Sequence, residues 1–261
     1  MTGLLEINTP EITAWVGRYM WPMFRISGFL LAAPFFGANF VPTRIRLLLA
    51  LVLTIVIAPM LPPVPRMDPF AMEHILLILN QTLIGVCLGF LLQIFMQLFV
   101  ISGQIIGMKM GLGFAMMNDP ANGVSVPVVA QFYLMMVTLL FLASNGHLVA
   151  IEILVESFYT IPVNVKGLNP NDLHLIPLWG SWMMAGALLM ALPAVVALTI
   201  VNMAFGVMSR AAPQMNVFAL GFPTALILGM FVMWVTQINM LALYQTFVAD
   251  ALEFMRLLIK A

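Results

Sequence analysis

The hydrophobic positions of this chain form long runs without charged side chains, and short breaks rich in glycine and proline separate the runs. Residues 75–108 hold no Asp, Glu, Lys or Arg, although about 20 apolar residues are enough to cross the hydrocarbon core of a bilayer. Residues 173–209 and 211–249 also lack these side chains, and only Arg210 stands between them. Such runs predict membrane-spanning helices that tilt, bend or project beyond the bilayer.

Three shorter apolar runs complete the pattern, at residues 15–41, 47–65 and 128–151. Arg18 and Arg25 interrupt the first run, and we expect them to face protein or water because a charge that faces lipid is costly. The sequence therefore predicts an all-α integral membrane protein with about six long apolar helices that proline and glycine break. The last two helices are expected to form a long helical hairpin.

The stretch from Gly103 to Pro127 fits neither a plain loop nor a spanning helix. It contains five glycines, four methionines, one lysine and one aspartate. Surface loops are mostly polar, and irregular apolar backbone persists near a bilayer only where it is buried in protein or lines a cavity. The stretch predicts a re-entrant or pore-facing segment, and the alternative is a loop whose apolar side chains pack on neighbouring helices.

One face of the longest early run carries small and amide side chains at every fourth position. Residues four apart lie on the same, slowly winding face of a helix. Such a face packs against other helices or borders water, and helix packing is the favoured interpretation. We expect it to be an assembly face that contacts neighbouring subunits. Its members are Gln81, Gly85, Gly89, Gln93 and Gln97.

Composition agrees with a membrane protein and removes several other classes. Hydrophobic residues make up 63% of the 261 positions and charged residues only 8%, so the chain cannot build a water-soluble surface. Ten basic and ten acidic side chains cancel, which leaves no basic patch for nucleic acid. The single cysteine, Cys87, cannot form an internal disulfide bond.

Arginines in short loops predict the orientation of the chain in the membrane. Arg44 and Arg46 mark one loop as cytoplasmic and Arg210 marks another, because lysine and arginine accumulate on the cytoplasmic side. Alternation through six apolar segments then places both termini outside and the central stretch on the cytoplasmic side. The tip of the hairpin, residues 209–216, is therefore expected to be cytoplasmic, with Arg210, Pro213 and Gln214.

Polar residues gather in two further places. Residues 152–177 read as a polar connector. The end of the chain carries Asp250, Glu253, Arg256 and Lys260 at spacings of three and four, which predicts a short amphipathic helix at an interface.

Candidate chemistry is sparse. The chain holds no phosphate-binding glycine motif, no His-Glu-x-x-His and no cysteine cluster. Glu152 and Glu156 lie four residues apart and could share a proton or bind a cation, but a solvated helix end explains them better. We therefore predict no catalytic, cofactor-binding or metal site, which disfavours an enzyme.

Four separated segments resemble a known family. They are PFFGANFVPTRIRLLLAL (34–51), GLGFAMMNDPANG (111–123), FLASNGHLVAI (141–151) and SRAAPQMNVFALGFP (209–223). In this order and over the whole length, they are similar to the FliR/SctT family of type III secretion export-gate subunits, in its flagellar FliR form. The resemblance implies a non-catalytic subunit in the bacterial inner membrane, at the flagellar basal body, that helps to form and seal a channel for unfolded protein substrates.

The resemblance also implies partners, domains and a gate. The partners are FliP and FliQ in a hetero-oligomeric channel, joined by FlhB and FlhA, with membrane lipid around them. The first part, residues 1–127, is similar to FliP and ends in the plug segment 103–127; residues 128–176 form a helix and connector; residues 177–261 form a FliQ-like hairpin and tail. The family's pore plug falls here on Gly111, Gly113, Phe114, Ala115, Met116, Met117, Asn118, Asp119, Pro120 and Asn122.

Two alternatives remain at this stage. One is a virulence secretion subunit of the SctT type. The other is a secondary transporter, whose interrupted helices would bind a small solute near the middle of the bilayer. A transporter should show two matching halves with paired breaks, and the halves of this chain differ.

Overall fold

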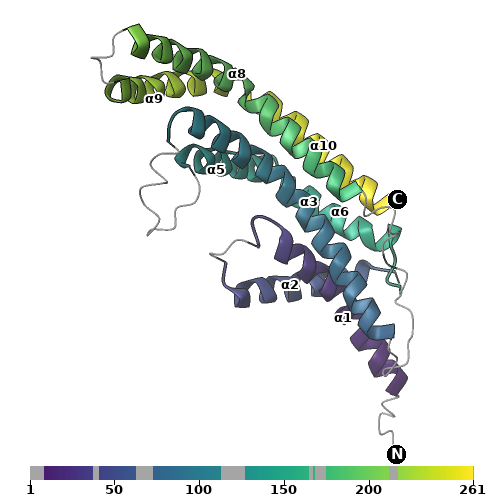
Figure 1. The fold of residues 1–261 in the computed structure, drawn as a ribbon. Coiled ribbons are helices and arrows are strands. Elements are labelled where there is room, and N and C mark those ends of the chain that lie inside the picture. The colour runs from purple at the N-terminus through teal and green to yellow at the C-terminus, as the bar shows by residue number, and fades with distance from the viewer. Residues whose placement is uncertain are drawn as a thin grey trace, which may run out of the picture. The chain divides into compact units, whose positions relative to one another are not determined.

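The structure is a computed structural model that describes residues 9–37, 41–62, 73–112, 127–164, 167, 175–211 and 217–260. Every regular element in these ranges is a helix (Figure 1), which confirms the predicted all-α class. The elements are α1 (Thr9–Ala32), α2 (Thr43–Ile57), η1 (Ala58–Met60), α3 (Glu73–Lys109), α5 (Val128–Ala143), α6 (Gly146–Thr160), α8 (Leu175–Ala211), α9 (Val217–Thr236), η3 (Gln237–Asn239) and α10 (Met240–Lys260).

Several helices are long and apolar enough to cross a membrane. Within the described ranges these are Thr43–Met60, His74–Lys109, Ile176–Ala211 and Gly221–Lys260, and the bent pair α5 and α6 makes a fifth if it counts as one span. The longest early run becomes α3, whose 37 residues extend over roughly 55 Å at 1.5 Å per residue. This is nearly twice the thickness of the hydrocarbon core, about 30 Å.

The run at residues 128–151 is two helices where the sequence predicts one. α5 and α6 meet at an angle of 69°, and Asn145 lies between them in the left-handed region with φ 57°. Asparagine enters this region more readily than most residues. α6 then continues to Thr160, so the first part of the predicted polar connector is helical. Its buried positions, three and four residues apart, explain this: Ala150, Ile153, Leu154, Ser157 and Phe158.

The C-terminal part confirms the long helical hairpin. α8 and α9 run in opposite directions along the chain (Figure 1), with Pro193 inside α8 and Pro223 inside α9. The predicted separate amphipathic tail is wrong in one respect, since Asp250 to Lys260 form the end of the 21-residue α10. The sequence from Met240 to Lys260 contains no glycine or proline, which could have ended the helix earlier.

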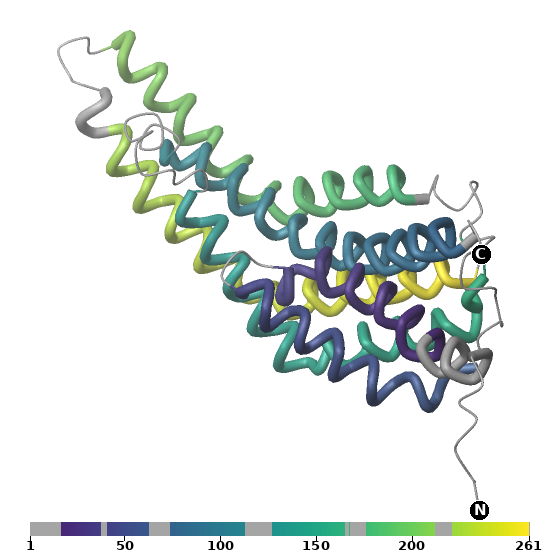
Figure 2. Tube along the Cα trace, turned by 90° about the horizontal axis from the view of Figure 1, so that it is seen from below, coloured from purple at the N-terminus to yellow at the C-terminus, as the bar shows by residue number. Residues whose placement is uncertain are grey.

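The chain divides into two compact units. Unit 1 comprises residues 1–93, 145–178 and 251–261, and unit 2 comprises residues 94–144 and 179–250. In unit 1, α1 lies along the first part of α3 (Figure 2). In unit 2, a group of aromatic side chains from α3, α5, α8 and α10 packs with ring centroids 5.5–6.1 Å apart. The group consists of Phe95, Phe99, Phe141, Trp182, Tyr244 and Phe247.

Candidate functional site

The end of α3 leads into the central stretch and has a specific cap. The backbone N–H of Leu112 donates to the carbonyl of Gly107 at 3.0 Å, and that of Gly111 donates to the carbonyl of Met108 at 3.1 Å. Gly111 has φ 84°. This is the Schellman motif, which favours glycine at the left-handed position. We call Met110, Gly111 and Leu112 the α3 cap.

The α3 cap corrects the expected start of the irregular segment. The sequence predicts irregular backbone from Gly103, but the helix continues to Lys109 and the chain turns only at the cap. Of the predicted plug residues, Gly111 belongs to the cap. The others lie outside the described residues: Gly113, Phe114, Ala115, Met116, Met117, Asn118, Asp119, Pro120 and Asn122.

The C-terminal hairpin touches the α3 cap at two points. A Cβ atom built on Gly229 of α9 would lie 2.5 Å from the Cγ of Met110, and one built on Gly111 would lie 3.0 Å from the Cδ2 of Phe222. Met110 is buried, with 2% of its surface exposed. Glycine at position 229 therefore makes the room that the Met110 side chain occupies.

A side chain of α8 reaches the last turn of α3. Asn202 Nδ2 donates to the carbonyl oxygen of Lys109 at 3.5 Å. The last carbonyls of a helix have no partner within the helix. The long hydrogen bond supplies one for Lys109.

The start of α5 packs on the same end of α3. A Cβ atom on Gly103 would lie 2.5 Å from the Cα of Ala130, and one on Gly107 would lie 3.0 Å from the Cβ of Pro127. Pro127 precedes α5 as its N-cap residue. The residues that flank positions 113–126 are thus held next to each other by two glycines of α3.

In unit 1, Arg25 is completely buried in a network of neutral acceptors. Its Nε donates to Gln81 Oε1 at 2.9 Å, its Nη1 to the carbonyl and Oγ of Ser157 at 2.7 and 3.0 Å, and its Nη2 to the carbonyl of Ile161 at 2.8 Å. The guanidinium carbon lies 4.2 Å from the centroid of the Phe158 ring. This confirms that Arg25 faces protein, whereas Arg18 is exposed.

The network joins three helices. Ser157 and Ile161 belong to the last turn of α6 and its cap, where carbonyl groups point outward and a positive charge is favourable. Gln81 is on α3 and Arg25 on α1. One side chain therefore binds the end of α6 to the α1 and α3 pair.

Three members of the predicted assembly face are covered by α1 of the same chain. A Cβ atom on Gly85 would lie 2.0 Å from the carbonyl oxygen of Arg25, and one on Gly89 would lie 2.6 Å from that of Phe29. Gln81 is buried against Arg25. These residues pack on α1, and contact with a partner subunit stays a prediction for the half-buried Gln93 and Gln97.

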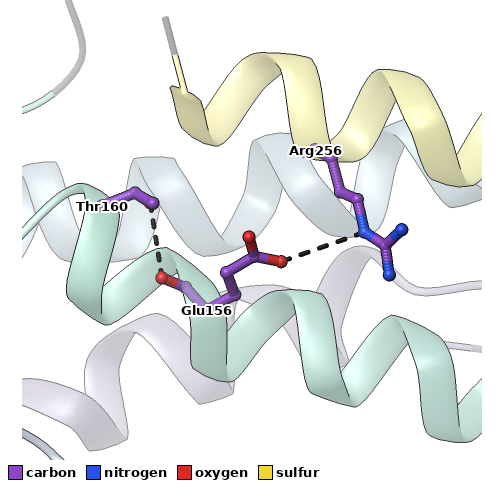
Figure 3. Close-up of polar contacts among 3 residues, drawn as sticks. All are labelled: Glu156, Thr160 and Arg256. Carbon is purple, nitrogen blue, oxygen red and sulfur yellow. Dashed lines mark hydrogen bonds and ion pairs between the residues drawn. The ribbon is translucent and has the colours of Figure 1, made fainter.

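Glu156 forms an ion pair with Arg256, which is 100 residues away in the sequence and could not be identified from it. Arg256 Nε lies 3.9 Å from Glu156 Oε2, with 45% and 35% of the two side chains exposed, and Thr160 donates to the Glu156 carbonyl (Figure 3). At this exposure the pair contributes at most about 1 kcal/mol. Glu152 is exposed, which favours the solvated helix end over a shared proton.

Within the described residues, no three His, Cys, Asp or Glu side chains gather to hold an ion. Arg210, in the predicted cytoplasmic tip, is exposed in the last turn of α8. Pro213 and Gln214 lie outside the described residues.

The contacts of the α3 cap and of Arg25 could not be found from the sequence. Phe222, Gly229 and Asn202 lie over 90 residues after α3 ends, and nothing in their spacing relates them to Gly111. Glycine at position 229, within a strongly apolar helix, is the one local signal of a close approach.

Long uncharged helices, close helix contacts through glycine and large exposed apolar surfaces define a helical integral membrane protein. Six of the apolar side chains that α8 and α9 leave more than 60% exposed are Leu189, Ile200, Met203, Ile227, Met230 and Trp234. Surface of this kind needs lipid or protein to cover it.

Residues 16–251 match the family described as "Bacterial export proteins, family 1", and the chain belongs to this family. It is 38% identical over 232 residues to the flagellar biosynthetic protein FliR of Escherichia coli (strain K12), with 88% of both chains covered. Two other proteins of the same name, from Pectobacterium carotovorum subsp. carotovorum and Bacillus subtilis (strain 168), are 34% and 30% identical. They cover 87% and 76% of this chain, and 86% and 78% of their own lengths.

Proposed function

We propose that this protein is a non-catalytic subunit of the flagellar type III protein export gate in the bacterial inner membrane. It assembles with FliP and FliQ into a channel for unfolded flagellar proteins, and FlhB and FlhA join the apparatus. The observation that carries the proposal is the match to the export family over residues 16–251, supported by relatives whose names are flagellar. These names favour the flagellar use over the virulence use.

The surface of the C-terminal hairpin supports assembly with other subunits. Large apolar side chains are exposed along α8 and α9, and only about a third of an apolar 18-residue stretch within Ile176–Ala211 is buried. An isolated chain can cover this surface with lipid, but the same surface also suits packing against similar helices. The proposal assigns part of it to FliP and FliQ.

Within this function, the segment after the α3 cap is the proposed plug. Gly113 to Asn122 combines apolar Phe114, Met116 and Met117 with backbone-loosening glycine. Methionine adapts to irregular neighbours, and a hydrophobic constriction can block water and ions by dewetting. Gly103 and Gly107 of α3 contact Ala130 and Pro127, which follow the segment in the chain, so the two elements on either side of it pack together.

Deletion of Gly113 to Met117 tests the plug. Because Gly111 and Leu112 complete the cap of α3, the deletion should begin after them so that the helix end is preserved. We expect ions and small solutes to leak through the assembled complex, while protein export persists at least in part. Conductance across the membrane and the yield of the purified complex are measured together.

Two controls make the result decisive. Met116→Ala should leak less than the deletion, since neighbouring apolar side chains still dewet the constriction. A fully assembled deletion variant that stays tight to ions would exclude the plug. A deletion variant that fails to assemble would favour a loop that only packs on neighbouring helices.

A further inference from the structure

We propose that α9 positions the α3 cap, and that Gly229 and Phe222 are the positioning residues through which the hairpin holds the start of the plug. This inference rests on the proposed function. It adds a role for two residues that lie 100 or more positions after the plug in the sequence.

Both contacts come from one face of α9. Phe222 and Gly229 are seven residues apart, which is about two helical turns and returns to the same side of the helix. Gly229 receives the buried side chain of Met110, and the ring of Phe222 lies beside Gly111. The face therefore contacts two consecutive residues of the cap.

The contact at Gly229 is sensitive to a single added atom. A methyl group there would come within 2.5 Å of Met110 Cγ, 2.8 Å of its Cε and 2.9 Å of its Sδ. Cγ lies close to the backbone and cannot swing away as a chain end can. The Met110 side chain must therefore move. Gly111, the left-handed residue of the cap, is its neighbour in the chain, so this movement disturbs the cap.

The test compares Gly229→Ala with Gly206→Ala in the complex with its partner subunits. Gly206 is a glycine of α8 with no atom within 4 Å of a built Cβ, so it controls for the substitution itself. Overpacking of a close contact destabilises it. We expect Gly229→Ala to raise the ion leak about tenfold (~1.4 kcal/mol), with unchanged complex yield, and Gly206→Ala to leave it unchanged.

A second substitution at the contact distinguishes positioning from general disruption. Met110→Ala combined with Gly229→Ala removes the Met110 atoms that the added methyl group would meet, and we expect the leak to return towards the wild-type value. If Gly229→Ala prevents assembly, Phe222→Ala decides, because it removes atoms and adds none. A leak from assembled Phe222→Ala then supports the proposal, and a tight Phe222→Ala overturns it.

The remaining outcomes separate this inference from the proposed function. If Gly229→Ala and Phe222→Ala both assemble and stay tight while deletion of Gly113 to Met117 leaks, α9 does not position the plug but the plug stands. If that deletion variant assembles and stays tight, the plug role within the proposed function fails instead. An equal leak from Gly206→Ala and Gly229→Ala would also overturn the positioning role.

Discussion

Arg25 shows at the scale of one residue how a charge is accommodated inside a mostly apolar protein. Four hydrogen bonds to neutral oxygens and a facing aromatic ring surround the guanidinium group. The planar fork of arginine reaches α3 and the end of α6 at once, which the compact ammonium group of lysine cannot do with the same geometry. The residue therefore acts as a cross-link between α1, α3 and α6.

Arg25→Met should destabilise the subunit by about 3 kcal/mol or more, because Gln81 and the carbonyls at the end of α6 lose their donor in a buried site. Arg25→Lys should recover only part of this loss. The apparent melting temperature of the detergent-solubilised complex measures both effects.

Arg18→Met is the matched control on the same helix, since Arg18 is exposed. Exposed substitutions usually change stability by about 0.5 kcal/mol or less. Equal melting temperatures for the Arg25 and Arg18 variants would show that the buried network contributes little.

At the scale of elements, the close pairing of α1 and α3 depends on glycine. Gly28 and Gly85 face each other's helix so closely that a Cβ on either would lie 2.6 Å or less from a backbone carbonyl oxygen. Helices approach in this way where small residues line the contact. Substitution of Gly85 by leucine would therefore disrupt the contact between α1 and α3 within the subunit. If such a variant lost its partner subunits, the result would not show that Gly85 belongs to an assembly face.

Gly85→Ala should lower the stability of the subunit by at least about 1–3 kcal/mol, because a backbone carbonyl at 2.0 Å cannot move aside without the helix. Gly180→Ala should be neutral or gain up to about 1 kcal/mol in helix stability. Gly180 has no atom within 4 Å of a built Cβ.

Purified subunit complexes of both variants, melted side by side, provide the measurement. A Gly85→Ala complex as stable as Gly180→Ala would mean that α1 and α3 tolerate separation. Gln93 and Gln97 are the better positions to test for partner contacts, because the contacts of α1 described above involve Gln81, Gly85 and Gly89 instead.

The length of uncharged runs predicts the long helices well, because membrane helices need apolar residues all along. The expected run 75–108 corresponds to α3 at Glu73–Lys109, and the expected run 173–209 to α8 at Leu175–Ala211. The corner at Asn145 escaped prediction because the run 128–151 around it is uncharged, although the Asn145-Gly146 pair is a turn signal. The cap contacts of α9 depend on tertiary packing, which no periodicity within α3 encodes.

At the scale of the whole molecule, the bent pair α5 and α6 decides the membrane topology. Arg44 and Arg46 lie at the start of the span Thr43–Met60, and Arg210 lies at the end of the span Ile176–Ala211. Between them lie α3 and the bent pair. The three arginines fall on one side, as the positive-inside tendency favours, only if α5 and α6 together cross the membrane once.

This argument predicts the sides of two ends of the chain. The tip between α8 and α9 and the C-terminus are separated by one candidate span, Gly221–Lys260. With the tip cytoplasmic, the C-terminus lies outside, and so does the loop after α6. In a Cys87→Ser background, Gln214→Cys should resist a membrane-impermeant thiol reagent in intact cells, while Lys260→Cys and Pro162→Cys should react.

Reaction of Gln214→Cys after the membrane is permeabilised shows that the thiol is reactive once the reagent can reach it. Labelling of Gln214→Cys in intact cells, with Lys260→Cys protected, would reverse the orientation of the hairpin. Protection of Pro162→Cys with labelling of Gln214→Cys in intact cells would mean that the bent pair enters and leaves on the same side. Arg210 would then stand on the opposite side from Arg44, and the positive-inside argument would no longer hold for this chain.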